Sequence, residues 1–555
     1  MFKKTDTAPE LSLFESPSHL LSKRGSKKYE DPHGWHNLFF NFVTCKIDES
    51  VFSPLFKSGN MGAPNASVRV LVGMSILKEG FGCSDEDLFD KCEFDLLTRK
   101  ALGLSMLDDA LPSLDTYYLF RRRICEYEET QGVNLMEKSF CQVTGEQIKQ
   151  FKISGKAIRM DSKLIGSNIA WYSRYEIIHN TFRCAMENIC LMQRLNPSLR
   201  KRMEAFLSED AQKTVYRSDS TTLAERIIDL GQVIYQVLVR IKADDTLLLY
   251  RVFHEQYMVE QGKITARDKK TISARSVQNP HDPDADYRKK GDQKIKGYST
   301  NITETVDEQG KPNLITDVQV KPANASDNGY VQEAIQSTEK VTGATVERLY
   351  ADGAYQSEDN RTYASLDKIE LMITGIQGKP SRFELEMDND GLRVTDKKTG
   401  EIIPAKKLTD KWRIEIKGKC KYRYFSQSQI QNAEFRRRLS DIPIEEQNKR
   451  NNVEATIFQY CFHTRNNKTR YRELLKHKLY SYARCLWINC RRLLIFLITT
   501  SQRTLEDMLN VVCWAMERYL QKEKGKFHDR MIFLKGILIE VNLSLEPRLL
   551  NLYTF

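Results

Sequence analysis

The chain has 555 residues, of which 41% are hydrophobic and 29% are charged. This apolar content supports a buried core and excludes a chain that is disordered throughout. Lys and Arg number 85 against 74 Asp and Glu, which gives a net charge of +11. A basic excess of this size suits a polyanionic partner without identifying one.

The sequence contains no segment that predicts a membrane anchor or a secretory signal. Its longest apolar run, Leu493 to Ile498, is far shorter than the ~20 residues of a membrane-spanning helix. The polar N-terminus has no apolar signal segment behind it. The twelve cysteines form no Cys-x-x-Cys pair, as is typical of reduced thiols. We therefore expect a soluble cytoplasmic protein that does not enter a membrane.

The N-terminal part of the chain favours helices. Residues 1–55 are expected to form an arm and a linker, and residues 56–150 a helical domain, because apolar residues recur there at helical spacing. Ser84, followed by three acidic residues, is typical of a helix start. A further predicted helix carries three consecutive basic residues, Arg121, Arg122 and Arg123. They cannot all face a core, so they indicate either a solvated helix face or a contact with phosphate.

Strands and helices alternate after residue 151. A predicted strand ends at Asp161, and residues 171–260 are predicted to be helical. Residues 297–306 and 314–320 read as a hairpin, a helix follows from Tyr330, and another strand leads to Asp352.

The C-terminal half contains a second change of pattern. Residues 376–440 hold short alternating runs separated by turn residues, which predicts a β-rich insertion. Residues 451–498 are helical and basic and include Glu454, whereas residues 501–555 read as a tail.

Three acidic residues stand where chemistry is plausible: Asp161 and Asp352 at strand ends, and Glu454 in a helix just after Arg450. Carboxylates at the ends of buried strands are costly unless a cation offsets their charge. Mg²⁺ prefers a few carboxylate ligands, and two such ions can drive phosphoryl transfer. With 74 acidic residues in the chain, spacing alone leaves open that the three are unrelated.

The surrounding residues resemble a known family. Arg159-Met-Asp161-Ser-Lys163-Leu, Leu349-Tyr-Ala-Asp352-Gly-Ala-Tyr355 and Asn451-Asn-Val-Glu454-Ala-Thr-Ile-Phe458 resemble the three acidic motifs of DDE-type transposases of bacterial insertion sequences. The stretches Asp282 to Arg288 and Lys321 to Asp327 look like the family's connecting segments. Upstream, residues 67–123 resemble its InsH-like N-terminal helical domain.

The resemblance implies an α+β or α/β chain with an RNase H-like core, a mixed five-stranded sheet with helices on both faces. It assigns residues 56–150 to a DNA-contacting domain and 151–500 to a catalytic domain interrupted by the helical and β-rich insertions. Glu454 lies 102 residues after Asp352, and some family members carry a β-domain at this point, which agrees with the predicted insertion.

The resemblance also implies the function of a transposase that cuts DNA at the ends of its element and joins the 3′-OH to target DNA. Asp161, Asp352 and Glu454 would be both the catalytic residues and the ligands of two Mg²⁺ or Mn²⁺ ions. Arg450, Lys468 and the three arginines at 121–123 would bind DNA. The partners would be double-stranded terminal repeats and target DNA, bound by a dimer at the bacterial nucleoid.

The chain departs from the family in one signature. Related elements carry Tyr, Arg, Glu and Lys at fixed spacing around the acidic helix. Arg450 and Glu454 fit this pattern, but Gln447 stands at the Tyr position and Cys461 at the Lys position. This departure leaves open which residue would grip the end nucleotides. Two alternative functions also stay open, a metal-dependent nuclease that cuts without joining and an inactive DNA-binding protein derived from a transposase.

Overall fold

The computed structural model describes most of the chain, namely residues 2–4, 17–57, 64–188, 196–306, 309–373, 381–388, 391–415, 422–440 and 442–520. The chain divides into two compact units. The first comprises residues 1–147, 309–312 and 486–555, and the second comprises residues 148–308 and 313–485. Among the described residues, no helix is long and apolar enough to cross a membrane.

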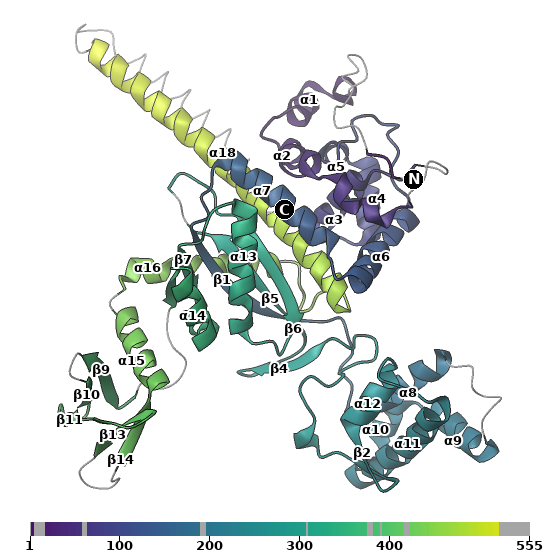
Figure 1. The fold of residues 1–555 in the computed structure, drawn as a ribbon. Helices are drawn as coiled ribbons and strands as arrows, with labels where there is room; N and C mark the ends of the chain where they lie inside the picture. Colours follow the sequence, from purple (N-terminus) through teal and green to yellow (C-terminus); the bar gives the residue numbers. More distant parts are fainter. Residues whose placement is uncertain are drawn as a thin grey trace. The chain divides into compact units, whose positions relative to one another are not determined.

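The first unit is helical (Figure 1). Its helices are α1 (Lys23–Tyr29), α2 (Trp35–Phe42), α3 (Val68–Phe81), α4 (Asp85–Phe94), α5 (Leu96–Ala101), α6 (Leu114–Gln131) and most of α7 (Leu135–Phe151). The predicted start of α4 is confirmed, because Ser84 and Asp87 form a reciprocal capping box.

Residues 23–55 differ from the expected arm and linker. They form α1, α2 and two 3₁₀ turns, Thr44–Lys46 and Glu49–Leu55. Phe39 and Phe52 are fully buried. The polar residues lie mainly before residue 35, whereas the residues after it contribute apolar side chains to the core, among them Leu38, Phe42, Val43 and Ile47.

An aromatic cluster joins α2, α3 and the last helix of the chain, α18 (Leu474–Leu520). The Trp487 ring lies 5.4 Å from Phe81 and 6.4 Å from Trp35. Gly80 permits this packing, since a Cβ at that position would overlap the Trp487 ring. Because α18 runs on to residue 520, residues 501–520 are helical rather than an irregular tail, and residues 521–555 lie outside the described part of the chain.

The second unit is built around a mixed sheet. Its strands are β1 (Ala157–Gly166), β4 (Asp286–Lys290), β5 (Gln293–Thr305), β6 (Ile315–Pro322), β7 (Arg348–Ala351) and β8 (Glu370–Ile373). The order is β4-β5-β1-β7-β8, with β6 also paired to β5. Strands β1, β7 and β8 are parallel, whereas β5 is antiparallel to β1, β4 and β6.

The sheet thus has six strands where five were predicted, because β4 pairs with the first half of β5 and β6 with the second half. Helices α13 (Val331–Thr342) and α14 (Glu358–Leu366) share a hydrophobic core with β1, β7 and β8. Helix α17 (Asn452–Cys461) packs against β1. Side chains alternate along β1, so α13 and α14 lie against one face of the strand and α17 against the other. Ile158 and Met160 belong to the core with α13 and α14. Arg159 points to the other face and donates to the carbonyl of Lys449, the residue before Arg450.

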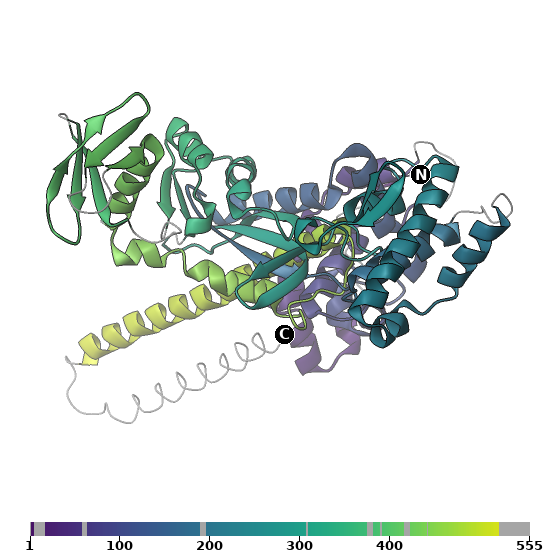
Figure 2. The ribbon, with the colours of Figure 1, turned by 90° about the horizontal axis from the view of Figure 1, so that it is seen from below.

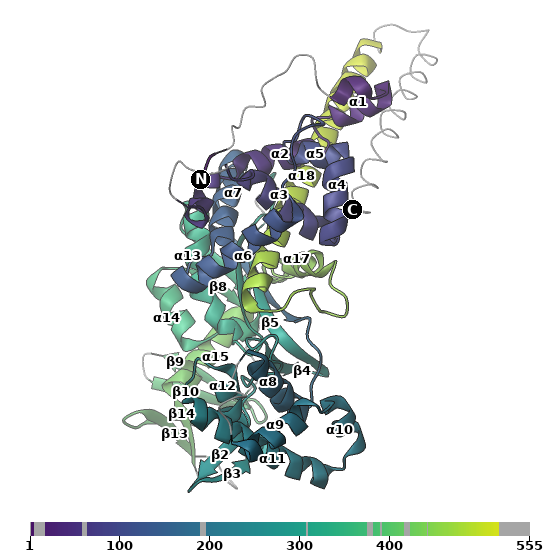
Figure 3. The same cartoon turned by 90° about the vertical axis from the view of Figure 1, so that its right-hand side faces the viewer.

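The segment predicted to be a helical insertion has a core of its own (Figure 3). It contains α8 (Arg174–Asn188), α9 (Pro197–Leu207), α10 (Ala211–Arg217), α11 (Ser220–Ile241), α12 (Leu248–Gln256) and the hairpin of β2 (Tyr257–Glu260) and β3 (Lys263–Ala266). Tyr257 joins the hairpin to α11 within this core, because its hydroxyl donates to the Ile227 carbonyl at 2.7 Å.

The β-rich segment forms two small sheets that are separate from the central sheet (Figure 2). One contains β9 (Phe383–Asp388), β10 (Gly391–Asp396) and β11 (Ile402–Pro404); the other contains β12 (Lys406–Lys407), β13 (Lys411–Glu415) and β14 (Tyr422–Ser426). Both share a core with α15 (Gln427–Ser440), so the end of this segment is helix rather than strand. Parts of the predicted range, residues 376–380 among them, lie outside the described residues. The short helix α16 (Ile444–Asn448) follows.

Candidate active site

Asp161 lies in the middle of β1, so the prediction that a strand ends there is wrong. The strand continues to Gly166 because Ser162 to Gly166 stay paired with β5. Asp161 stands opposite Ile302 of β5, on the same face as Arg159. Its carboxylate accepts the Ser162 amide at 2.8 Å.

Asp352 follows the last residue of β7, as predicted. It caps a 3₁₀ turn, Gly353–Tyr355, and its side chain accepts the Gly353 amide at 2.6 Å. Strand β7 is parallel to β1, with Tyr350 opposite Arg159. Two residues further along both strands, Asp352 therefore comes to the level of Asp161. Parallel register thus unites carboxylates that are 191 positions apart in the sequence.

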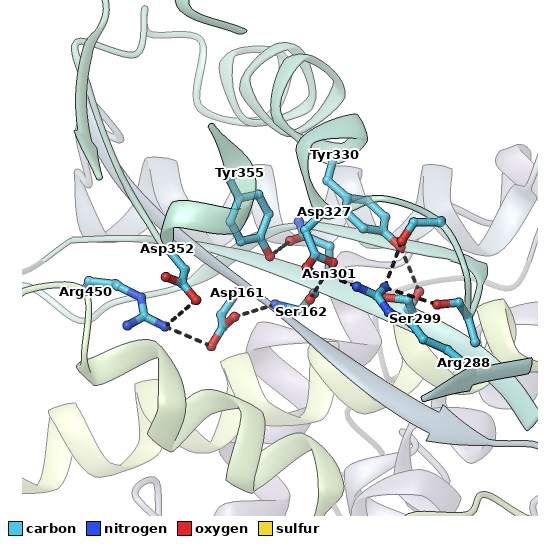
Figure 4. A network of polar contacts seen from close by, with 12 residues as sticks. Asp161, Ser162, Arg288, Ser299, Asn301, Asp327, Tyr330, Asp352, Tyr355 and Arg450 are labelled. Atoms are coloured by element: carbon cyan, nitrogen blue, oxygen red, sulfur yellow. Dashed lines mark hydrogen bonds and ion pairs between the residues drawn. The ribbon is translucent and has the colours of Figure 1, made fainter. Parts of the chain in front are cut away.

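The guanidinium of Arg450 faces both carboxylates (Figure 4). Its Nη2 atom is 3.6 Å from Asp161 Oδ2 and 3.9 Å from Asp352 Oδ2. The guanidinium is mostly buried, and its Nε has no hydrogen-bond partner among the described residues. Burial raises the pKa of Asp161 above its ordinary value, and the Ser162 amide and Arg450 oppose this rise. The carboxylates and the guanidinium therefore form a loosely satisfied ionic cluster.

Glu454 is not brought into this cluster. It lies in the first turn of α17, one helical turn beyond Arg450, and its side chain is exposed. No group of three or more His, Cys, Asp or Glu side chains in the described residues is arranged to hold a metal ion. Asp161 and Asp352 offer oxygen ligands of the kind that Mg²⁺ prefers, but Arg450 is the cation beside them in this conformation.

A closed ionic network lies two residues before Asp161. The Arg159 Nε donates to Glu304 Oε1 at 2.6 Å across the β1–β5 pair, and its Nη1 donates to the Lys449 carbonyl at 3.0 Å. Thr456 of α17 donates to Glu304 Oε2 at 2.6 Å. Arg159 and Glu304 are almost completely buried. The network joins α17 and the residue before Arg450 to the sheet, so it positions Arg450.

Sequence reasoning assigned no role to this network. Arg159 belongs to the acidic motif that contains Asp161, which is the one signal in the sequence that could have drawn attention to it. Glu304 and Thr456 carry no local signal, since their importance arises from pairing over 145 and 152 residues.

The opposite face of β1 carries a second set of polar residues that sequence reasoning did not assign (Figure 4). Ser162 donates to Asp327 at 3.0 Å, and the Arg288 guanidinium lies 3.6 Å from the same carboxylate. The Tyr355 hydroxyl donates to Asn301 at 2.8 Å. Arg288, Asp327 and Tyr355 all lie in the stretches that carry the resemblance, which indicates that these stretches also preserve the sheet around Asp161.

The predicted DNA-binding residues have different environments. Arg121 is largely buried and lies 3.5 Å from Asp85, whereas Arg122 is exposed beside Glu126. Arg123 is partly exposed. Lys468 is partly buried in the loop before α18, with its ammonium 3.4 Å from the Ile169 carbonyl. Arg122 is thus the most accessible of the three arginines, and Lys468 contributes to loop packing.

Cys461, at the position of the family's Lys, is partly buried at the end of α17. Burial raises the pKa of its thiol, and nearby Lys163 acts in the opposite direction. Lys163 points to the same face of β1 as Asp161, two residues away. A cation therefore lies beside the position where the sequence lacks one. The side chain of Gln447 lies outside the described residues.

Comparison with known proteins supports a transposase family. Residues 36–123 match the model of a transposase domain, DUF772. This stretch covers α2 to most of α6, in the helical unit. No curated protein matches the chain. The match therefore suggests a role in transposition and an enzymatic activity, with DNA as the partner that such a role requires.

Proposed function

We propose that the chain is a DDE-type DNA transposase that cuts at the ends of its element and joins the freed 3′-OH to target DNA. The observation that carries this proposal is the convergence of Asp161 and Asp352 on Arg450. It occurs in a chain that also matches a transposase domain. A mixed sheet with α13 and α17 on opposite faces is compatible with an RNase H-like core.

Asp161 and Asp352 would hold Mg²⁺ or Mn²⁺, as two ions, together with Glu454 from α17. When bound, such ions activate the attacking oxygen and stabilise the leaving oxygen. The oxygen donors fit this role in kind, and burial raises the pKa of Asp161 above its ordinary value. Completion of the set requires Glu454 to turn toward the sheet and Arg450 to release the carboxylates.

Arg450 would bind a phosphate of the DNA backbone. Its buried Nε has no hydrogen-bond acceptor in the described part of the chain, and a guanidinium fork matches phosphate oxygens. If the Arg450 guanidinium binds a phosphate, Asp161 and Asp352 become free to bind cations. Arg122, Arg123 and Lys163 are further candidates for phosphate contacts, and two element ends would be held by a dimer.

The test is cleavage of a DNA fragment that carries the inverted repeats flanking the gene, in Mg²⁺. We expect Asp161→Asn, Asp352→Asn and Glu454→Gln each to reduce cleavage by about a thousandfold or more, because metal ligands are needed for chemistry. DNA binding should remain. The matched control is Glu347→Gln, an exposed carboxylate paired with Lys156 at the surface, which should cleave normally.

Near-normal cleavage by Asp161→Asn or Asp352→Asn would contradict the proposal. A joining assay with a pre-cut end and a target plasmid then separates a transposase from a nuclease, since only the transposase yields joined strands. Glu454→Gln is the sharpest of the three tests, because Glu454 stands apart from the other two carboxylates in this conformation.

A further inference from the structure

The sheet formed by β12, β13 and β14 has one face that takes no part in its core. Ile414 and Phe425 point inward and are buried. Because side chains alternate along a strand, the neighbouring residues point outward. These outward residues are Lys406, Lys411, Arg413, Tyr422 and Tyr424, which we call the tyrosine–lysine face. Glu415 adds one carboxylate at its end.

The two tyrosines are exposed, and an arginine side chain lies against one of them. Tyr422 and Tyr424 are 44% and 49% exposed. The Arg413 guanidinium lies 4.5 Å from the centre of the Tyr422 ring, and Arg413 stands directly opposite both Lys406 and Tyr424 in the strand register. Basic side chains on β12 and β13 therefore lie beside aromatic side chains on β14.

The neighbouring sheet of the same segment is different. On the outward side of β9 and β10, Arg393 stands opposite Glu386, and Thr395 stands opposite Glu384. Glu386 also forms an ion pair with Arg437 of α15. Both sheets contribute to one core, so folding does not account for exposed tyrosines and excess cations on one sheet alone.

We propose that the tyrosine–lysine face binds unpaired nucleotides of a DNA strand. Bases would stack on Tyr422 and Tyr424, and Lys406, Lys411 and Arg413 would neutralise phosphates. Aromatic residues on an open sheet are a common platform for unstacked bases. In a duplex the base faces are covered by their neighbours, so the tyrosines select unpaired strands. This inference rests on the proposed function, because a strand that has been cut at an element end can separate from its complement.

The first experiment measures binding of the full chain to a fluorescent oligo(dT) of about 20 nucleotides, a length above the site size of typical single-strand binders. Tyr422→Ala and Tyr424→Ala should each weaken binding by about tenfold, as expected for loss of one stacked base. Tyr422→Phe and Tyr424→Phe should bind like wild type, because stacking needs the ring and not the hydroxyl. Affinity for a duplex of the same length should change less than twofold.

The matched control is the double variant Met387→Ala and Ile402→Ala. These side chains are 41% and 52% exposed on the neighbouring sheet, so the variant removes a similar amount of exposed apolar surface. It should leave oligo(dT) binding unchanged. Equal loss in the control and in the tyrosine variants would overturn the proposal.

A second experiment needs no substitution. An oligonucleotide with 5-iododeoxyuridine, cross-linked to wild-type protein by light and mapped by mass spectrometry, should attach to Tyr422 or Tyr424. Cross-links only elsewhere, or Ala variants that bind oligo(dT) normally, would overturn the proposal.

The proposed function and the proposed role of the tyrosine–lysine face can be refuted separately. Asp161→Asn should lose cleavage but keep oligo(dT) binding and the cross-link. If wild type cleaves element ends yet does not bind oligo(dT), the tyrosine–lysine face is refuted and the transposase proposal stands. If the tyrosine–lysine face binds oligo(dT) and wild type does not cleave element ends, the proposal for this face stands and the transposase proposal is refuted.

Discussion

Two arginines on the same side of β1 are held in contrasting ways. Arg159 has short hydrogen bonds of 2.6 and 3.0 Å to Glu304 and the Lys449 carbonyl, in an almost fully buried network. Arg450 has ion pairs of 3.6 and 3.9 Å to Asp161 and Asp352, and its Nε has no partner among the described residues. Asp352 is also half exposed.

The contrast distinguishes an ionic network that stabilises the fold from an ionic cluster that can change its partners. A buried ion pair with satisfied hydrogen bonds keeps its geometry, because breaking it leaves an uncompensated charge. A loosely satisfied cluster near solvent can exchange partners at lower cost, as the proposed binding of phosphate and cations requires. The Arg159 network therefore supports the fold, and the Arg450 cluster is the part that can change.

The largest effect should come from breaking the closed network. Glu304→Gln leaves the Arg159 charge buried and should lower the free energy of unfolding of the second unit by about 3–5 kcal/mol. Urea denaturation followed by circular dichroism measures this change. Glu347→Gln, at an exposed pair with Lys156, should leave the midpoint unchanged. Equal midpoints for Glu304→Gln and wild type would remove the distinction between the two arginines.

The next effect concerns Arg450 and DNA. Arg450→Ala should weaken DNA binding about tenfold and make the slope of log affinity against log salt shallower by about one unit, as for one lost phosphate contact. Its unfolding free energy should fall less than that of Glu304→Gln. Arg200→Ala, at a surface pair with Glu204 in the helical insertion, is the control. An unchanged slope for Arg450→Ala would contradict the proposed contact between Arg450 and a phosphate.

The smallest effect is on stability and depends on pH. The pKa of Asp161 is raised in the folded chain, above its ordinary value of 3.8. The ionised carboxylate therefore destabilises the folded state, and this cost appears as the pH rises through the folded pKa. Asp161→Asn should be slightly more stable than wild type at pH 7 in EDTA. The difference should vanish below about pH 3, where the carboxyl is protonated in both states. Urea midpoints at both pH values test the sign, and a less stable Asp161→Asn at pH 7 would contradict it.

Several features of the fold could be predicted from local sequence. The Ser84 cap, the strand leading to Asp352, the helix carrying Glu454 and the strands of the β-rich segment lie where the sequence indicated. Each depends on residues within a few positions of one another, through capping, alternation or helical period. The burial of residues 23–55 and the length of β1 were missed, because both depend on what packs beside them.

The sequence by itself determined many of the helices and strands after residue 56, and which carboxylates stand in motif-like surroundings. Only the tertiary structure decided which charges meet. Arg159 pairs with Glu304 over 145 residues through strand register, and Arg450 reaches Asp161 through the anchoring of α17. Glu454, one turn further on, faces solvent. Local patterns follow from neighbouring residues, whereas the position of a charge relative to another depends on register and packing between distant segments.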